Sequence, residues 1–189
     1  AGNGGGLYVG NDFNGRIYAN YFAGNQAING GGMYVGHNFT GTLDSYSFFI
    51  NNIASGDGGG LYVANDFIGD IKGAIVNNNT AQNNGGGLYI NNNLQGNLGG
   101  DYTGNTASAD GGAVWIGSII SGNIQGTFNT NTATNGSGGA IWVSRNLGGG
   151  ILNSVFKQNT AGTNGGAVDI EGSVNGDLNN IQFIQNKTT

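Results

Sequence analysis

Two acidic residues have the spacing of a catalytic pair. Asp169 and Glu171 lie two positions apart, so on an extended strand their side chains would share one face, about 7 Å apart. That separation suits the acid and base of an inverting glycosidase. Asp66 and Asp70, which flank Phe67 to Gly69, are a second and similarly weak candidate pair. Surface carboxylates near turns are common in proteins without activity, so we predict no catalytic residues and no enzyme.

Metal-binding and redox chemistry have few candidate residues. The sequence has no cysteine and only one histidine, His37, which we expect in a loop. The calcium-binding nonapeptide GGxGxDxUx is missing, and Asp57 with the three glycines after it is interpreted as a turn. We therefore predict no metal site and no cofactor.

Net charge excludes one class of partner and leaves others open. Five Lys and Arg residues stand against ten Asp and Glu, for a net charge of −5, so no basic surface is expected to meet the phosphates of a nucleic acid. No apolar run reaches the roughly 18 residues of a membrane span. Partners are then expected to be a protein, a cell surface or further copies of the chain.

A repeated phrase organises the elements that would carry any site. Gly-Gly-Gly-Leu-Tyr-Val at residues 4–9 recurs six more times along the chain, with substitutions. Its first large apolar residue recurs at intervals of 26 to 28 positions: Leu7, Met33, Leu61, Leu88, Val114, Ile141 and Val168. A constant period of this length indicates a stacked-repeat architecture. Seven copies fill residues 1–189, which predicts one repeat domain.

Each copy contains three short apolar segments, which we call stations, and these predict three short strands. The first station is the segment that begins at Leu7 and its equivalents. The second station reads apolar-x-Gly-x-apolar, as in Phe13 to Ile17, and the third reads aromatic-x-x-Asn-x-Ala, as in Phe22 to Ala27. The predicted fold is all-β, a right-handed parallel β-helix (a β-solenoid) of about seven turns with roughly 27 residues each. Alternation along the first strand places Leu7 and Val9 inside and Tyr8 outside. The glycine of the second station is expected to leave room for its large neighbours.

Seven asparagines of the third station recur once per copy. Side-chain amides repeated at every turn can bond to the copies above and below, so we predict a structural asparagine ladder. Its members are Asn25, Asn52, Asn79, Asn105, Asn131, Asn159 and Asn186.

Six aromatic residues are predicted to form an external stripe, with Asp169 in the seventh place: Tyr8, Tyr34, Tyr62, Tyr89, Trp115 and Trp142. Small residues two positions before them are expected on the same face, as a floor: Gly6, Gly32, Gly60, Gly87, Ala113, Ala140 and Ala167. Small or polar residues two positions after them complete that floor. Such a stripe commonly marks an interaction surface. Three interpretations stay open: the rings support one another and the sheet, they meet a protein or a neighbouring rod, or they stack on sugars.

The later copies resemble a known repeat family. Phe128 to Ala133 followed by Gly138-Gly139-Ala140-Ile141, and Phe156 to Ala161 followed by Gly165-Gly166-Ala167-Val168, are similar to the paired FxxN and GGA(I/L/V) repeats of the polymorphic outer-membrane proteins. The resemblance implies a right-handed β-helix in the passenger of an autotransporter adhesin. The first four copies depart from it, with Gly-Gly-Gly in place of Gly-Gly-Ala.

The first and last copies are as apolar as the inner ones, so the sequence predicts no polar capping turn. Either the chain is a segment of a longer rod, or copies stack head to tail into a filament. We therefore expect a secreted or cell-surface protein with a structural or adhesive task, as the passenger segment of a surface adhesin. The alternative is a subunit of an extracellular filament, and a carbohydrate-binding or carbohydrate-active protein is a third hypothesis.

Overall fold

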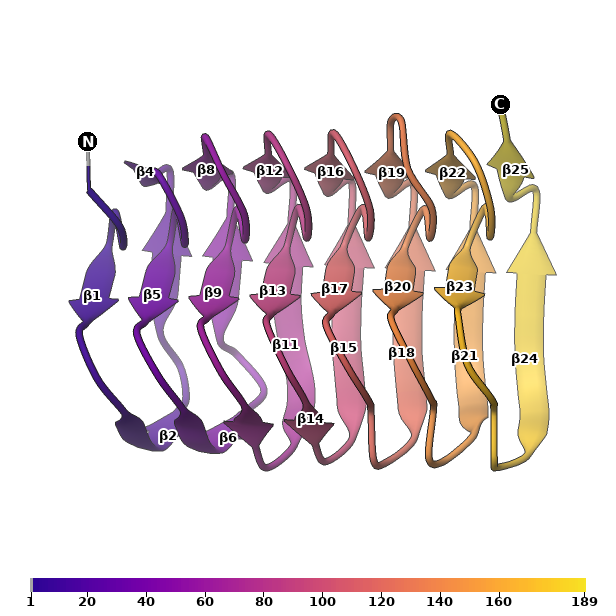
Figure 1. Cartoon of the computed structure of the whole chain (residues 1–189), viewed down its shortest axis with the longest axis horizontal. Coiled ribbons are helices and arrows are strands. Elements are labelled where there is room, and N and C mark those ends of the chain that lie inside the picture. Colours follow the sequence, from indigo (N-terminus) through magenta and orange to yellow (C-terminus); the bar gives the residue numbers. More distant parts are fainter. Residues whose placement is uncertain (1) are drawn as a thin grey trace.

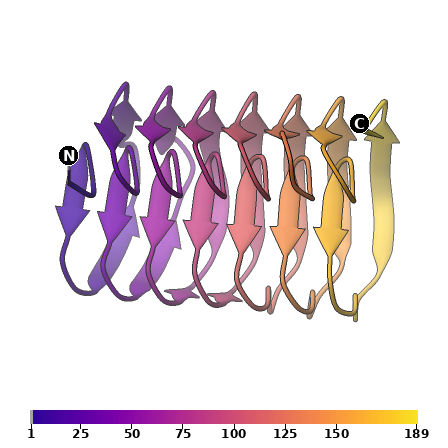
Figure 2. The ribbon, with the colours of Figure 1, turned by 45° about the horizontal axis from the view of Figure 1, so that its top comes forward.

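The chain forms a right-handed parallel β-solenoid of about seven turns, as the repeat predicts. The computed structural model describes residues 2–189, and all regular elements in that range are β-strands. In Figure 1 the first strand of each turn runs down the near side and the long strand runs up the far side, while the chain advances from N to C. Figure 2 shows the same coil tilted, with the turns stacked in register.

Three sheets wrap the solenoid. The first sheet contains one three-residue strand per turn: β1 (Leu7–Val9), β5 (Met33–Val35), β9 (Leu61–Val63), β13 (Leu88–Ile90), β17 (Val114–Ile116), β20 (Ile141–Val143) and β23 (Val168–Ile170). All neighbours pair in parallel, and Leu7 lies beside Met33, which lies beside Leu61. A column in the sequence alignment is therefore a physical column in the molecule.

The second sheet has eleven strands, and its shape changes along the rod. The early turns divide it into β2 (Phe13–Ile17), β3 (Tyr21–Ala23), β6 (Phe39–Leu43), β7 (Phe48–Ile50), β10 (Phe67–Ile68) and β14 (Leu94–Gln95). Later turns have one long strand each: β11 (Ile71–Asn77), β15 (Leu98–Thr103), β18 (Ile124–Asn129), β21 (Ile151–Lys157) and β24 (Leu178–Ile184). The end of the predicted second station and the start of the third have merged there into one strand.

The third sheet follows the asparagine column. Its strands have two residues each: β4 (Gln26–Ala27), β8 (Ile53–Ala54), β12 (Thr80–Ala81), β16 (Thr106–Ala107), β19 (Thr132–Ala133), β22 (Thr160–Ala161) and β25 (Lys187–Thr188). The alanines of the inner turns are buried and the residues before them face outward. These short strands turn the chain back toward the first sheet.

The core is a set of columns of like side chains. Phe128 stacks between Tyr102 and Phe156, with 4.8 Å between ring centroids on each side. Aliphatic columns such as Leu88, Val114 and Ile141 are fully buried. Because every turn repeats the same apolar positions, each side chain meets its own kind one turn away.

The predicted floor on the N-terminal side of the aromatic residues is wrong. Ala113 and Ala140 are fully buried and belong to the hydrophobic core. A methyl group added at Gly32 would lie 3.2 Å from the ring of Phe49, in the interior. These positions, from Gly6 to Ala167, therefore face inward.

A backbone irregularity explains this inward orientation. The amides of Ala113 and Val114 both donate to the carbonyl oxygen of Ala140, at 2.9 Å each. Two consecutive residues thus oppose one, as in a β-bulge, and the alternation of side chains breaks between them. Both Ala113 and Val114 consequently point into the core.

The glycine of the second station also has a different role from the predicted one. Gly41 has φ +144° and Gly69 has φ +135°, a region that L side chains rarely adopt. A Cβ at Gly41 would overlap the carbonyl oxygen of Gly15 in the preceding turn. Close approach of successive backbones, and not room for large neighbours, requires glycine from the second turn onward.

Candidate interaction surface

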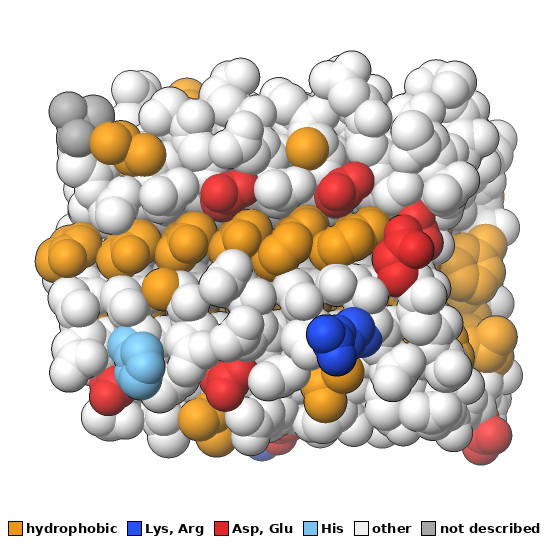
Figure 3. All heavy atoms as spheres, viewed as in Figure 1, with side chains coloured by type: hydrophobic (Ala, Val, Ile, Leu, Met, Phe, Trp, Pro, Cys, Tyr) orange, Lys and Arg blue, Asp and Glu red, His pale blue; other side chains and the backbone are white. Residues whose placement is uncertain are grey.

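The aromatic residues form one continuous stack along the first sheet. Their ring centroids lie 5.3, 5.0, 4.8, 4.3 and 5.2 Å apart in order from Tyr8 to Trp142, and successive planes differ by 2° to 16°. Figure 3 shows the stack as an unbroken apolar stripe across this face of the rod. We call the six residues the aromatic stripe.

Stacking decides which parts of the rings meet solvent. The side chain of Tyr8 is 57% exposed at the start of the stripe, whereas Tyr89 in the middle is only 8% exposed. Each inner ring is covered on both flat faces by its neighbours, so its edge and polar atoms remain for contact. Flat stacking of sugar rings needs free aromatic faces, and the inner part of the stripe offers none.

The floor on the C-terminal side of the stripe lies on the outer face. A methyl group at Gly10 would lie 3.4 Å from the ring of Tyr8. The hydroxyl of Tyr89 donates to Oδ1 of Asn91 at 3.0 Å. The rings therefore lean over these residues, and the lack of large side chains there keeps the stripe flat.

Burial and nearby charge raise the pKa values of the central phenols further above the physiological range. Burial raises the pKa of Tyr62, and the nearby Tyr34 and Asp57 raise it further. The pKa of Tyr89 is also raised, first by burial and then by the charge of Asp57. Both hydroxyls therefore remain neutral hydrogen-bond donors through the physiological range.

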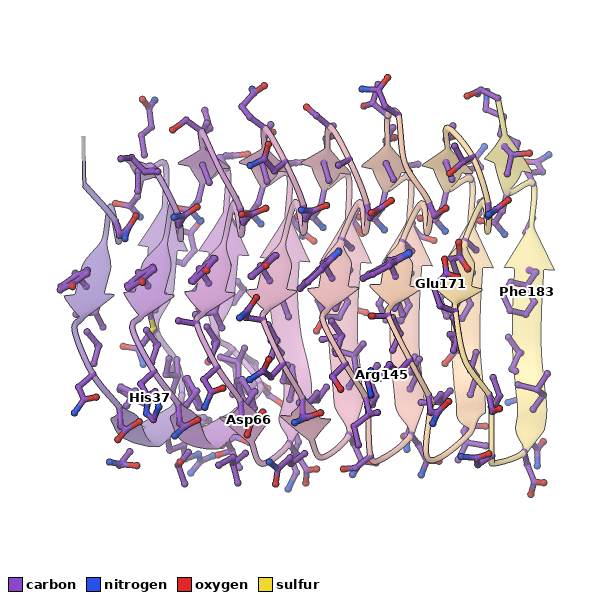
Figure 4. The ribbon with its side chains drawn as sticks, in the orientation of Figure 1. His37, Asp66, Arg145, Glu171 and Phe183 are labelled. Atoms are coloured by element: carbon purple, nitrogen blue, oxygen red, sulfur yellow. The ribbon has the colours of Figure 1, made fainter. Side chains whose placement is uncertain are left out.

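The stripe ends at two carboxylates. Asp169 of β23 pairs with Trp142 in the sheet and takes the seventh place of the column, and Glu171 follows on the same outer side (Figures 3 and 4). Oδ2 of Asp169 is buried and has no hydrogen-bond partner among the described residues. The structure thus brings these two predicted carboxylates to the end of the aromatic stripe.

The seven predicted asparagines form one ladder at the bend before the third sheet. Nδ2 of Asn105 donates to Oδ1 of Asn131 at 3.0 Å and to the carbonyl oxygen of Val76 at 2.7 Å. Its Oδ1 accepts from both the backbone amide and Nδ2 of Asn79, at 3.0 Å each. The same bonds join the other members from Asn25 to Asn186. Each buried amide thereby satisfies both its own hydrogen-bonding groups and those of the bend.

Three further columns of Asp and Asn oxygens were missed by the sequence reasoning. In one, Oδ1 of Asp57 accepts from the backbone amide of Asn84, whose own Oδ1 accepts from that of Asp110. Asp66 and Asp70 belong to the other two, since their Oδ1 atoms accept from the amides of Asn93 and Asn97 at 3.0 and 2.8 Å. In all three, the oxygen accepts from the turn that follows, opposite to the asparagine ladder.

A signal for the first of these columns is present in the sequence. An oxygen-bearing side chain stands four residues before the first large apolar residue of every copy: Asn3, Asn29, Asp57, Asn84, Asp110, Ser137 and Asn164. Recurrence at a fixed offset marks a structural position. The direction of its hydrogen bonds follows only from the coordinates.

His37 lies at the lower bend in Figure 4, with Nδ1 2.7 Å from Oδ1 of Asp12. The pKa of Asp12 is lowered, first by the hydrogen bond from the backbone amide of Asn38 and then by His37.

Among residues 2–189, no group of three or more His, Cys, Asp or Glu side chains could hold a metal ion. The same range contains no helix of the length and apolarity needed to cross a membrane.

Comparisons with protein-family models, curated proteins and solved structures find no match to this chain. The similarity to the polymorphic outer-membrane proteins therefore remains a prediction from the repeat pattern.

Proposed function

We propose that this chain is an extracellular structural and adhesive β-solenoid, whose aromatic stripe contacts a protein on a cell surface. One observation carries the proposal: six aromatic side chains lie in a single flat row on a rigid sheet. Tyrosine and tryptophan combine a large contact area with a polar group, which favours them at protein interfaces. The proposal assigns the chain no catalytic step.

Rigidity supports such a role. Neighbouring turns pair residue by residue along three sheets, and the ladders satisfy the polar groups of the bends. A partner would therefore meet a surface that is already ordered, with little conformational entropy left to lose. The similarity of the repeats to those of surface adhesins points to the same role.

Binding to cells tests this proposal. Fluorescently labelled chain is added to cultured epithelial cells and to immobilised fibronectin and laminin. We expect saturable binding to at least one of them, and at least tenfold weaker binding after the paired substitution Tyr34→Ser and Tyr62→Ser. The matched control is Tyr21→Ser with Tyr46→Ser, which changes two exposed tyrosines outside the stripe. Absence of binding to all three surfaces, or equal losses in both variants, would contradict the proposal.

We also propose that residues 1–189, as an isolated segment, can assemble into a filament, because side chains of their first and last turns are exposed. Leu178 and Phe183 of the last turn are 65% and 54% exposed, and Leu7 of the first turn is also exposed. The backbone amide of each inner asparagine in the ladder donates to Oδ1 of the next. By the same rule, the amide of Asn186 in one copy suits Oδ1 of Asn25 in another.

Electron microscopy distinguishes the two functions. Filament formation predicts long fibres at micromolar concentration, which Phe183→Lys reduces to short rods because it places a charge in the contact. Tyr46→Lys, at an exposed residue of the second turn and away from the two terminal turns, serves as the control and should leave the fibres intact. Short rods of the unmodified chain at all concentrations would refute the filament.

A further inference from the structure

A groove lies on the outer face of the second sheet. The long strands of that sheet run along the far side of the rod in Figure 1, and the strands of the first sheet, which carry the aromatic stripe, run along the near side. The groove has a volume of about 480 Å³, within the range of small-molecule sites. Its floor consists of Gly99 and Gly100 of β15 and Gly126 of β18, and its walls carry Lys72, Gln125 and Asn153.

Differences in strand length create this groove. Four positions separate Leu98 from Tyr102 in β15, and the corresponding part of β18 has the same length. The flanking strands β11 and β21 each hold one extra residue there, and the register shifts at both junctions. The extra residues take left-handed conformations, with φ +73° at Gly73 and +46° at Asn153. Two bulged turns thus border two shorter turns, and such bulges often occur beside functional sites.

The side chains along the groove offer amides and almost no free charge. The amide of Gln125 makes no hydrogen bond within the described residues. Oδ1 of Asn153 accepts from Asn180 at 2.9 Å, which leaves Nδ2 of Asn153 as a donor. The one ammonium group, that of Lys72, lies 3.2 Å from a carboxylate oxygen of Asp70. An amide both donates and accepts, as a hydroxyl does.

We propose that this groove binds one or two residues of an uncharged oligosaccharide. The free amides pair with hydroxyl groups, and the absence of side chains on the glycine floor lets a sugar ring approach the backbone closely. Because the charge of Lys72 is neutralised by Asp70, the groove has no net charge to select an anion. This site is separate from the aromatic stripe, so the proposal stands whether or not the stripe binds a protein.

Titration of the labelled chain with defined sugars tests the proposal. The probes are maltose, cellobiose and diacetylchitobiose, with inorganic phosphate as the charged alternative, and the readout is the NMR shift of backbone amides. We expect at least one sugar to cause saturable shifts at Gly99, Gly100 and Gly126, with a millimolar dissociation constant. Phosphate should cause none there.

Two variants and one control complete the experiment. Gln125→Ala should weaken binding at least fivefold, and so should Asn153→Gly, which keeps a residue that accepts the positive φ. Gln182→Ala, an exposed glutamine on the same sheet, should leave binding unchanged. The proposal is overturned if no sugar causes saturable shifts in the groove, if phosphate alone does, or if Gln182→Ala weakens binding as much as Gln125→Ala.

Discussion

The phenol ring of Tyr89 lies parallel to the indole of Trp115, with 4.3 Å between the ring centroids and 2° between the planes. This is the shortest centroid distance in the stripe, and it joins the four tyrosines to the two tryptophans. Each ring serves both as surface and as support for its neighbour. Substitutions can therefore separate the contribution of the stripe to stability from its contribution to binding.

Removal of a central ring of the aromatic stripe should lower the free energy of unfolding more than removal of the first ring. Tyr89→Ala loses a largely buried side chain and two stacked neighbours, so we expect a loss of about 2–4 kcal/mol in the free energy of unfolding. Tyr8→Ala loses an exposed ring with one neighbour and should cost about 1 kcal/mol or less. Urea denaturation followed by circular dichroism measures both values. Equal costs would mean that stacking contributes little.

Substitution of an asparagine in the middle of the ladder should lower the free energy of unfolding more than substitution at its end. Asn105→Ala removes an oxygen that accepts two hydrogen bonds and a nitrogen that donates two, all buried. Each buried group left without a partner costs about 1–3 kcal/mol, so we expect a loss of at least about 3 kcal/mol. Asn186→Ala, in the last turn, should cost less than half as much. Thermal unfolding of the two variants side by side checks this, and similar midpoints would contradict it.

Glycine should be required in the second turn but not at the same place in the first. A Cβ at Gly15 meets only the ring of Phe13, at 3.7 Å, whereas one at Gly41 would overlap the carbonyl oxygen of Gly15. We expect Gly15→Ala to change the free energy of unfolding by less than about 1 kcal/mol and Gly41→Ala to cost about 3 kcal/mol or more. The two unfolding curves decide the matter, and a tolerated Gly41→Ala would refute the close approach.

Acidic pH should reduce the stability that Asp70 and its column of hydrogen bonds contribute to the fold. The pKa of Asp70 is lowered, first by the hydrogen bond from the amide of Asn97 and also by Lys72. A lowered folded-state pKa contributes stability above the unfolded value near 3.8, and this contribution is lost as the pH falls through the folded pKa. Asp70→Asn keeps the accepting oxygen and removes the titration. Its melting temperature should fall less between pH 6 and pH 2.5 than that of the unmodified chain, and an equal fall would exclude Asp70 as a contributor.

The period of the sequence was sufficient to predict the architecture. Leu7, Met33 and Leu61 recur at a nearly constant interval, and stacking in register is the arrangement that pairs their strands and buries Met33 and Leu61. The column of asparagines at Asn105 and its equivalents was visible for the same reason. These features depend on which residues recur and at what spacing.

Only the tertiary structure revealed four other features. They are the inward orientation of Ala113, the opposite directions of the ladders, the covered faces of the aromatic rings and the groove between β11 and β21. The sequence shows that the spacing from Leu98 to Tyr102 is one residue shorter than the corresponding spacing in β11. The spacing alone does not predict whether this difference changes a loop or forms a groove on a sheet. Each of these features depends on contacts between successive turns, as when the amides of Ala113 and Val114 share the carbonyl oxygen of Ala140. Such contacts join residues about 27 positions apart in the sequence, so local alternation along one strand cannot predict them.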